Sequence, residues 1–277
     1  MNIQVNNTGI RIRPSSIDNF VNCPLQWAKV FLEGRTSIPG ARAAIGTSIH
    51  KAAEVLWSEA IKQGKVDDNV EKLTDAAVEE FAEIEKKDKL YYDPQEDTNT
   101  AQDTIVKGVR AFVEDIVPFT PIPLAVEQFL EIPISGNPII NAIGGTIDYL
   151  TDTVVADVKT SRRKAVMHHY TTQQSVYKYL AQSHGYNIEH SLIQNVILRK
   201  TSTEGLIGEL TPNVEQAKFI VNKMLETMEI VEAGTIPLNV LFRGNPKYYL
   251  CSEKYCAFFN ECDWVKGEAV CQKRPVL

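Results

Sequence analysis

The stretch GGTIDYLTDTVVADVKTS, residues 144–161, decides the fold of this chain. It joins two runs rich in β-branched residues, 139–150 and 153–160, which predict two strands. Thr151-Asp152 lies between the runs and predicts the turn of a hairpin. Strands joined by so short a turn pair in an antiparallel manner, so we expect this hairpin at the centre of a β-sheet.

Three charged side chains of this hairpin are expected to share one face. With the predicted turn, Asp148 faces Val155, and strand side chains alternate with a period of two. Asp157 and Lys159 then point to the same side as Asp148, and the two carboxylates stand diagonally, about 7–8 Å apart. Such a pair suits Mg²⁺ or Mn²⁺, which activates water, while a lysine offsets charge on a phosphate. The alternative is an exposed strand pair with ordinary surface charges.

The rest of the chain alternates between helical and extended patterns. Apolar residues at helical spacing predict six helices: one from Ser15, then 47–63, 67–88, one ending near Pro118, 168–184 and 212–233. Apolar, β-branched runs predict further strands at 124–134, 189–199 and 205–211. This order predicts an α/β fold with a mixed sheet.

Composition limits the kind of protein further. The 277 residues include 29 basic and 35 acidic ones, for a net charge of −6, which argues against a polybasic nucleic-acid binder. Residues 1–14 have no apolar signal core, and no apolar run reaches membrane-spanning length. We therefore expect a cytoplasmic protein, with any nucleic-acid contact confined to a local basic patch.

The hairpin motifs resemble those of the PD-(D/E)XK nuclease superfamily, and within it the RecB-type exonucleases. GGTIDYL and VVADVKTS are similar to that family's G-x-x-D and D-x-K-[TS] motifs. The resemblance implies a restriction-endonuclease-like core, in which a central mixed β-sheet is flanked by helices. It also implies that Asp148, Asp157 and Lys159 are catalytic in a Mg²⁺- or Mn²⁺-dependent deoxyribonuclease.

Other segments resemble the same family. Gly46 to His50 is similar to the helix that supplies a metal-binding histidine, so the implied metal ligands are His50, Asp148 and Asp157. The resemblance also implies substrate contacts by Gln173 and Tyr177 of a Q-x-x-x-Y motif, and by Arg162 and Arg163 after the lysine. Glu127, on the strand before the hairpin, resembles a further acid of the family and is a possible member of the site.

The cysteines form a separate pattern. Cys251, Cys256 and Cys262 cluster near the C-terminus, and Cys23 lies far upstream. In an intracellular protein such a set indicates a metal site, holding either zinc or an iron–sulfur cluster. The spacing is unlike paired zinc knuckles and resembles RecB-type nucleases with a [4Fe-4S] cluster, including CRISPR-associated ones, although the gap after Cys251 is longer than usual. Cys271 is predicted to be a non-ligand.

Together these features predict one nuclease domain over residues 1–277, with an N-terminal helical region (14–120), a nuclease core (121–235) and a C-terminal iron–sulfur clasp (248–271). We expect a DNA exonuclease acting on free ends, single-stranded ones above all, in recombination, repair or CRISPR-type processing. The chain has no P-loop, so unwinding would need a helicase partner. The alternatives are a non-catalytic subunit for DNA-end binding or adaptation, and a zinc-stabilised interaction protein.

Overall fold

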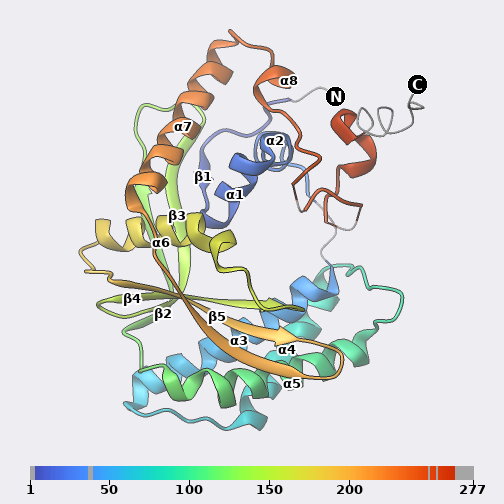
Figure 1. The fold of residues 1–277 in the computed structure, drawn as a ribbon, viewed down its shortest axis with the longest axis vertical. Coiled ribbons are helices and arrows are strands. Elements are labelled where there is room, and N and C mark those ends of the chain that lie inside the picture. The colour runs from blue at the N-terminus through green and yellow to red at the C-terminus, as the bar shows by residue number, and fades with distance from the viewer. Residues whose placement is uncertain (1–3, 37–39, 249, 254, 266–277) are drawn as a thin grey trace, which may run out of the picture. The chain divides into compact units, whose positions relative to one another are not determined.

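The computed structural model describes residues 4–36, 40–248, 250–253 and 255–265 (Figure 1). These residues form an α/β fold in which a mixed sheet of six strands is flanked by helices. This is the restriction-endonuclease-like architecture that the sequence predicts. Cys271 lies outside the described residues.

The strands are ordered β1-β3-β4-β5-β6, and β2 pairs with β3. Adjacent pairs are parallel for β1/β3 and β4/β5, and antiparallel for β3/β4 and β5/β6. The bounds are β1 Ile10–Ile12, β2 Ala125–Pro133, β3 Ile140–Leu150, β4 Val154–Ser161, β5 His190–Leu198 and β6 Thr203–Leu210. The short strand β1 has no counterpart in the sequence prediction.

The α-helices of the described residues are α1 Pro14–Asn22, α2 Pro24–Phe31, α3 Ala41–Gln63, α4 Val70–Lys87, α5 Thr98–Asp115, α6 Thr171–Ser183, α7 Val214–Ala233 and α8 Leu238–Leu241. Side chains cap several N-termini: Asn69 accepts from the Lys72 amide at 3.2 Å, and Asp97 and Thr100 form a capping box. None of the described helices is long and apolar enough to cross a membrane.

The chain divides into two compact units. The first unit comprises residues 1–37, 131–145 and 213–277, and the second comprises 38–130 and 146–212. The residues predicted to be catalytic, Asp148, Asp157 and Lys159, lie in the second unit, and the four predicted cluster cysteines lie in the first. A single nuclease domain stays a prediction.

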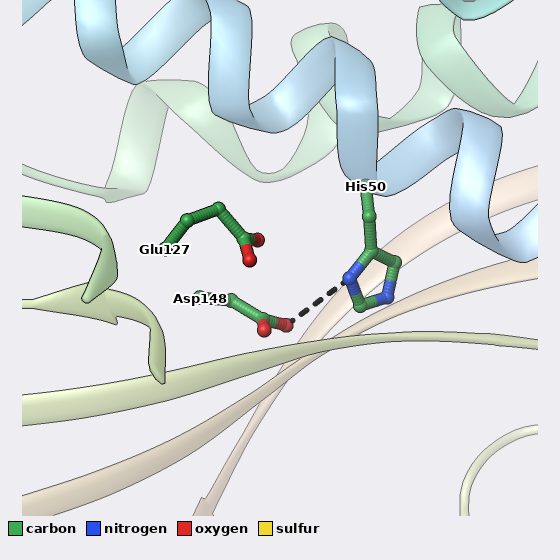
Figure 2. Close-up of side chains that lie close together, drawn as sticks. All are labelled: His50, Glu127 and Asp148. Carbon is green, nitrogen blue, oxygen red and sulfur yellow. Dashed lines mark ion pairs between the residues drawn. The ribbon is translucent and has the colours of Figure 1, made fainter. Parts of the chain in front are cut away.

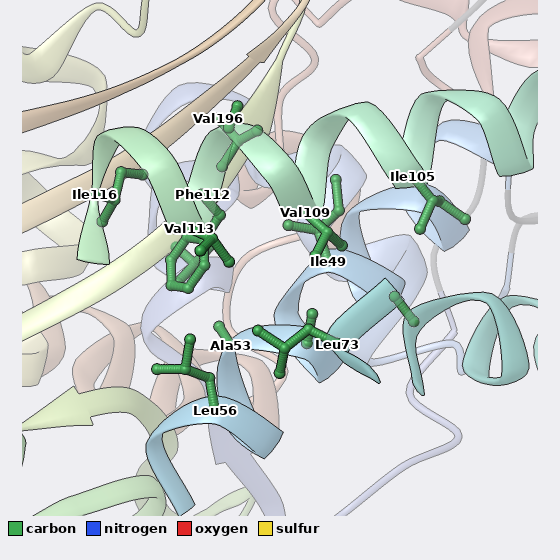
Figure 3. Packing of buried hydrophobic residues seen from close by; sticks show 14 of the residues in the cluster. Ile49, Ala53, Leu56, Leu73, Ile105, Val109, Phe112, Val113, Ile116 and Val196 are labelled. Carbon is green, nitrogen blue, oxygen red and sulfur yellow. The ribbon is translucent and has the colours of Figure 1, made fainter. Parts of the chain in front are cut away.

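The core of the second unit lies where α3, α4 and α5 meet one face of the sheet. Buried residues of the three helices, among them Ile49, Leu73 and Phe112, pack together as Figure 3 shows. Ala156 and Val158 of β4 belong to the same cluster. Because strand side chains alternate, Asp157 and Lys159 point to the opposite face of β4. On that face Asp157 contacts Gln173 of α6.

The β3–β4 hairpin has the predicted faces but not the predicted register. Leu150 faces Val155 and Tyr149 faces Ala156, a shift of two residues from the expected pairing. The turn residues are Asp152 and Thr153, because the Thr151 amide donates to the Val154 carbonyl at 2.9 Å. A shift of two leaves every side chain on its face, so the shared face of the charged residues is unaffected.

The N-terminal helical segment is broken, contrary to the continuous pattern predicted from Ser15. The break falls at Cys23, whose non-helical backbone (φ −146°, ψ 77°) separates α1 from α2. Pro24 explains it, since a proline disfavours helical geometry in the residue before it and is well accommodated at a helix start. Helix α3 in turn begins at Ala41, six residues before its predicted start, because residues 41–45 are mainly strong helix formers.

The turn generates a stability prediction. The Thr151 hydroxyl accepts from the amides of Thr153 (3.2 Å) and Val154 (2.9 Å). We expect Thr151→Val, which keeps the shape and removes the hydroxyl, to lower the free energy of unfolding by about 1 kcal/mol. Urea unfolding checks this, with Thr151→Ser as the control that retains the acceptor. Equal stability of the Val and Ser variants would contradict it.

Candidate active site

Three potential metal ligands converge in the second unit. His50 comes from α3, Glu127 from β2 and Asp148 from β3, and Figure 2 shows their side chains pointing toward one another. One ligand atom from each lies within 4.8 Å of the others. Among the described residues, no other three histidine, cysteine or acidic side chains approach one another this closely.

The close approach of α3 to β4 depends on Gly46. A Cβ atom at this position would lie 2.8 Å from Thr160 Oγ1, closer than side-chain carbons normally come. Gly46 stands one helical turn before His50, so the glycine lets the helix bring the imidazole to the strands. This gives the Gly46–His50 motif a physical meaning.

Asp148 is held from two sides. Its Oδ2 atom lies 3.3 Å from His50 Nδ1 and accepts from the Val158 amide at 2.8 Å. The side chain is only 12% exposed. The carboxylate is therefore fixed in position by a strand amide, with the imidazole beside it.

Asp157, which is buried, forms an ion pair with the half-buried Lys159 beside this group. Asp157 Oδ2 lies 2.6 Å from Lys159 Nζ, and its Oδ1 lies 3.4 Å from Gln173 Nε2 on α6. The same amide nitrogen lies 3.4 Å from the Tyr177 hydroxyl. The predicted Gln-x-x-x-Tyr motif thus contacts a predicted catalytic carboxylate, and the tyrosine contacts the glutamine.

Burial changes the protonation of these acids. Burial, with a smaller contribution from the charge of Asp148, raises the pKa of Glu127 to about 7. For Asp157, burial and Asp148 raise the pKa to about 6, although the Lys159 ammonium opposes them. Burial disfavours the charged form of Lys159, but the Asp157 carboxylate outweighs this effect, and the pKa of Lys159 is raised. A divalent cation would relieve the repulsion among the carboxylates.

Glu127 also has an unusual backbone. Its φ angle is +46°, and it is the one described non-glycine residue with positive φ. This left-handed conformation costs an ordinary residue about 1–3 kcal/mol and is concentrated at functional sites. The sequence assigns Glu127 only a possible role, because a single glutamate in a strand shows no pattern. Its position beside His50 and Asp148 makes it the third member of the group, whereas Asp157 is engaged with Lys159.

A cleft of about 590 Å³ opens at this site. It is lined by His50, Glu127, Lys159 and Thr160 of the predicted motifs, and by Arg42, Ala43, Gly46, Thr47, Lys51, Glu54 and Glu80. Lys51 and Glu54, which pair at 2.9 Å, have no sequence signal beyond their place in an ordinary helix. The cleft therefore carries both acids and cations.

The two arginines predicted to bind substrate follow β4 but are engaged differently. Arg162 Nη2 lies 2.8 Å from Glu96 and 3.9 Å from Asp93. Arg163 has an exposed side chain, and its carbonyl accepts from the Ser161 hydroxyl at 2.5 Å. Sequence spacing could not reveal the acidic partners of Arg162, which come from the segment before α5.

The four predicted cluster cysteines lie together in the first unit. Cys23, Cys251, Cys256 and Cys262 line one pocket, with Leu25, Tyr248, Phe258 and Phe259 among its other walls. Cys23 and Cys262 are buried. Burial, with the neighbouring Cys23 and Cys262 adding to it, raises the pKa of the Cys256 thiol.

The mixed sheet and the carboxylate–lysine site define the class of nucleases built on a restriction-endonuclease-like core. The chain belongs to the PD-(D/E)XK nuclease superfamily, whose family model matches residues 11–263. No match was found among curated proteins.

Solved structures that are similar to this chain include the following two. One is a candidate exonuclease from Eubacterium rectale, 11% identical over 82% of each chain, with a TM-score of 0.52. The other is SSO0001, 19% identical over 51% of this chain and 60% of that one, with a TM-score of 0.34. The first structure supports the fold described above. The TM-score of the second is too low to show that the two proteins share a fold.

The raised pKa of Glu127 predicts how stability depends on pH without divalent ions. Its folded-state pKa of about 7 exceeds the ordinary value of 4.5, so the folded protein binds this proton more tightly than the unfolded chain. The contribution of Glu127 to stability is therefore present below pH 4.5 and is lost as the pH rises through 7. Glu127→Gln should raise the melting temperature in EDTA more at about pH 8 than at about pH 5. The same difference at both pH values would contradict the burial argument.

Proposed function

We propose that this protein is a divalent-metal-dependent DNA exonuclease of RecB type, acting on free and mainly single-stranded ends. The observation that carries the proposal is the convergence of His50, Glu127 and Asp148 beside the Asp157–Lys159 ion pair. The motif resemblance supplies the exonuclease type, and membership of the nuclease superfamily supports hydrolysis of a nucleic acid.

The donor set fits Mg²⁺ or Mn²⁺. Two carboxylates and one imidazole offer hard oxygen ligands and one borderline nitrogen, a combination that Mn²⁺ accepts well and Mg²⁺ tolerates. Such an ion, when bound, polarises a phosphate oxygen and lowers the pKa of a coordinated water. His50, Glu127 and Asp148 would hold it, with Asp157 as a further acid of the predicted ligand set.

The residues around the metal group have distinct roles in this proposal. Lys159 directs its ammonium to the site and offsets the charge that develops on the phosphate. Asp157 fixes that ammonium at 2.6 Å, and Gln173 restrains Asp157 from α6. Because Asp157 is buried and contacts both Lys159 and Gln173, the ammonium of Lys159 is positioned before substrate arrives. A charge fixed in advance needs no reorganisation during the reaction, which favours electrostatic catalysis.

The cleft suits single-stranded DNA better than double-stranded DNA, which would need a broad basic face. Its cations, Arg42, Lys51 and Lys159, lie among the acids Glu54, Glu80 and Glu127, and the chain as a whole carries a net charge of −6. Phosphate contacts confined to a cleft favour a strand that can be threaded. From the resemblance to RecB-type nucleases we further propose a helicase or CRISPR-type partner.

We also propose a [4Fe-4S] cluster held by Cys23, Cys251, Cys256 and Cys262. All four line one pocket with aromatic walls, so the donor set fits thiolate ligation. Structural zinc sites usually come as short paired knuckles. One cysteine far upstream and three near the C-terminus do not form such pairs, which favours a cluster in which each thiolate binds a different iron.

Catalysis is tested by removing the ion pair. Asp157→Ala or Lys159→Ala should reduce divalent-dependent degradation of end-labelled DNA at least about 100-fold, since both act mainly in the transition state. Asp152→Asn, an exposed acid in the turn of the same hairpin, is the control and should retain activity. Unchanged activity in both site variants would refute the active-site assignment.

The metal group is tested through His50. With an imidazole among the ligands, activity with Mn²⁺ should equal or exceed that with Mg²⁺. His50→Ala should move the Mn²⁺ titration of activity to higher concentration while leaving DNA affinity nearly unchanged. If the titration does not move, His50 is a packing residue.

The cluster is tested by iron, sulfide and colour. Protein purified without oxygen should be brown, and Ala at Cys23, Cys251, Cys256 or Cys262 should remove iron and lower the melting temperature, because a four-thiolate site loses a ligand. Cys271→Ala should retain iron and stability. Wild-type protein that contains zinc and no iron would overturn the cluster.

A further inference from the structure

Two arginines and two acids form a compact charged network at the edge of the second unit's cleft. Arg42 Nη2 lies 2.6 Å from Asp93 Oδ2 and 2.5 Å from Glu96 Oε1. Arg162 Nη2 approaches the same two carboxylates, at 3.9 Å from Asp93 and 2.8 Å from Glu96. The segment before α5 therefore places two negative charges between two guanidinium groups.

The network adjoins the residues proposed to be catalytic. Arg42 stands in the first turn of α3 and lines the cleft together with Lys159 and Thr160. Arg162 directly follows β4, the strand that carries Asp157 and Lys159. A strand whose scissile phosphate reached Lys159 would bring its neighbouring phosphates toward these arginines.

The two acids of the network are more buried than the arginines with which they pair. Both carboxylate side chains are only 22% exposed, whereas Arg162 is 53% exposed. Both carboxylates contact Arg42 through the single atom Nη2, so they use only part of the hydrogen-bonding capacity of this guanidinium, whose side chain is 31% exposed. Lys200 adds a third cation, since its Nζ lies 2.8 Å from Gln95 of the same segment.

We propose that Arg42 and Arg162 form a binding site for backbone phosphates of the DNA strand, and that Asp93 and Glu96 occupy it as internal phosphate mimics. This inference rests on the proposed nuclease function and goes beyond it by assigning Arg42 and a competing acidic segment. The identity of the ligand follows from chemistry, because guanidinium groups bind carboxylates and phosphates with the same paired geometry.

Competition of this kind sets the affinity for DNA. A site that its own carboxylates occupy binds substrate more weakly, in proportion to the fraction of molecules in which it is open. Removing one carboxylate charge should raise that fraction and expose a net positive charge. The resulting increase in affinity should be sensitive to salt, because every further phosphate that is neutralised releases counterions.

The test measures binding of a fluorescent single-stranded oligonucleotide by anisotropy, with Ca²⁺ in place of Mg²⁺, so that affinity is read independently of cleavage. Glu96→Gln should tighten binding about fivefold in about 0.1 M salt. It should also steepen the slope of log affinity against log salt by about 0.7 for each additional phosphate that the arginines bind. Asp93→Asn should act in the same direction and serves as a second variant. Arg42→Gln should weaken binding by a similar factor.

Two comparisons separate masking from a general charge effect. Glu226→Gln on α7 changes the net charge equally, and it should leave affinity unchanged because Glu226 pairs with Lys223 and not with either arginine. In the Arg42→Gln/Arg162→Gln background, Glu96→Gln should no longer tighten binding.

The outcomes are distinguishable. If the wild type binds DNA but Glu96→Gln and Asp93→Asn bind no more tightly, or if the tighter binding persists without the two arginines, the inference is wrong and the proposed function stands. If the wild type binds no DNA, the proposed function fails, and the inference fails with it.

Discussion

The ion pair between Asp157 and Lys159 is the interaction on which the rest of the site depends. Asp157 is 2% exposed, and a carboxylate at such depth is tolerated only beside an opposite charge. Removal of one partner from a buried pair typically costs about 3–5 kcal/mol, because the other charge stays buried. On β4, Ala156 and Val158 face the helical core, whereas Asp157, held by Lys159, faces Gln173 of α6.

The other acids of the site are held at a cost to stability. Glu127 has a strained backbone and a carboxyl that burial and Asp148 keep partly protonated near neutral pH. Asp148 is fixed by the Val158 amide and cannot turn away from its neighbours. These groups repel one another without a cation and attract one with high charge density. The same features that destabilise the metal-free protein thus prepare a site for a divalent ion, as is common where function opposes stability.

Much of this arrangement can be predicted from the sequence, and the reasons are specific. Asp148 and Asp157 fall on one face even with the wrong turn, because the error in register is two residues and side chains repeat every two. The break at Cys23 escapes prediction because apolar spacing continues across it, although Pro24 signals it. Glu127 shows only a possible role, since its importance arises from β2 lying beside β3 and not from a local pattern.

Long-range contacts account for what the sequence could not provide. The acids that engage Arg42 and Arg162 lie 51 to 69 positions away in the chain, where no periodicity links them. Gly46 is part of a motif, but only the 2.8 Å approach to Thr160 explains why the motif needs a glycine. The four cysteines, by contrast, can be predicted as one set from their spacing and from the family resemblance, and in the first unit all four line one pocket.

The central claim is that His50, Glu127 and Asp148 hold one divalent cation next to Lys159. Anomalous diffraction at the manganese edge, from crystals grown with Mn²⁺, tests this claim most directly. The account predicts a peak bounded by those three side chains, which is lost in a His50→Ala/Asp148→Ala variant. A manganese peak elsewhere in the second unit, or an empty site at saturating Mn²⁺, would contradict it.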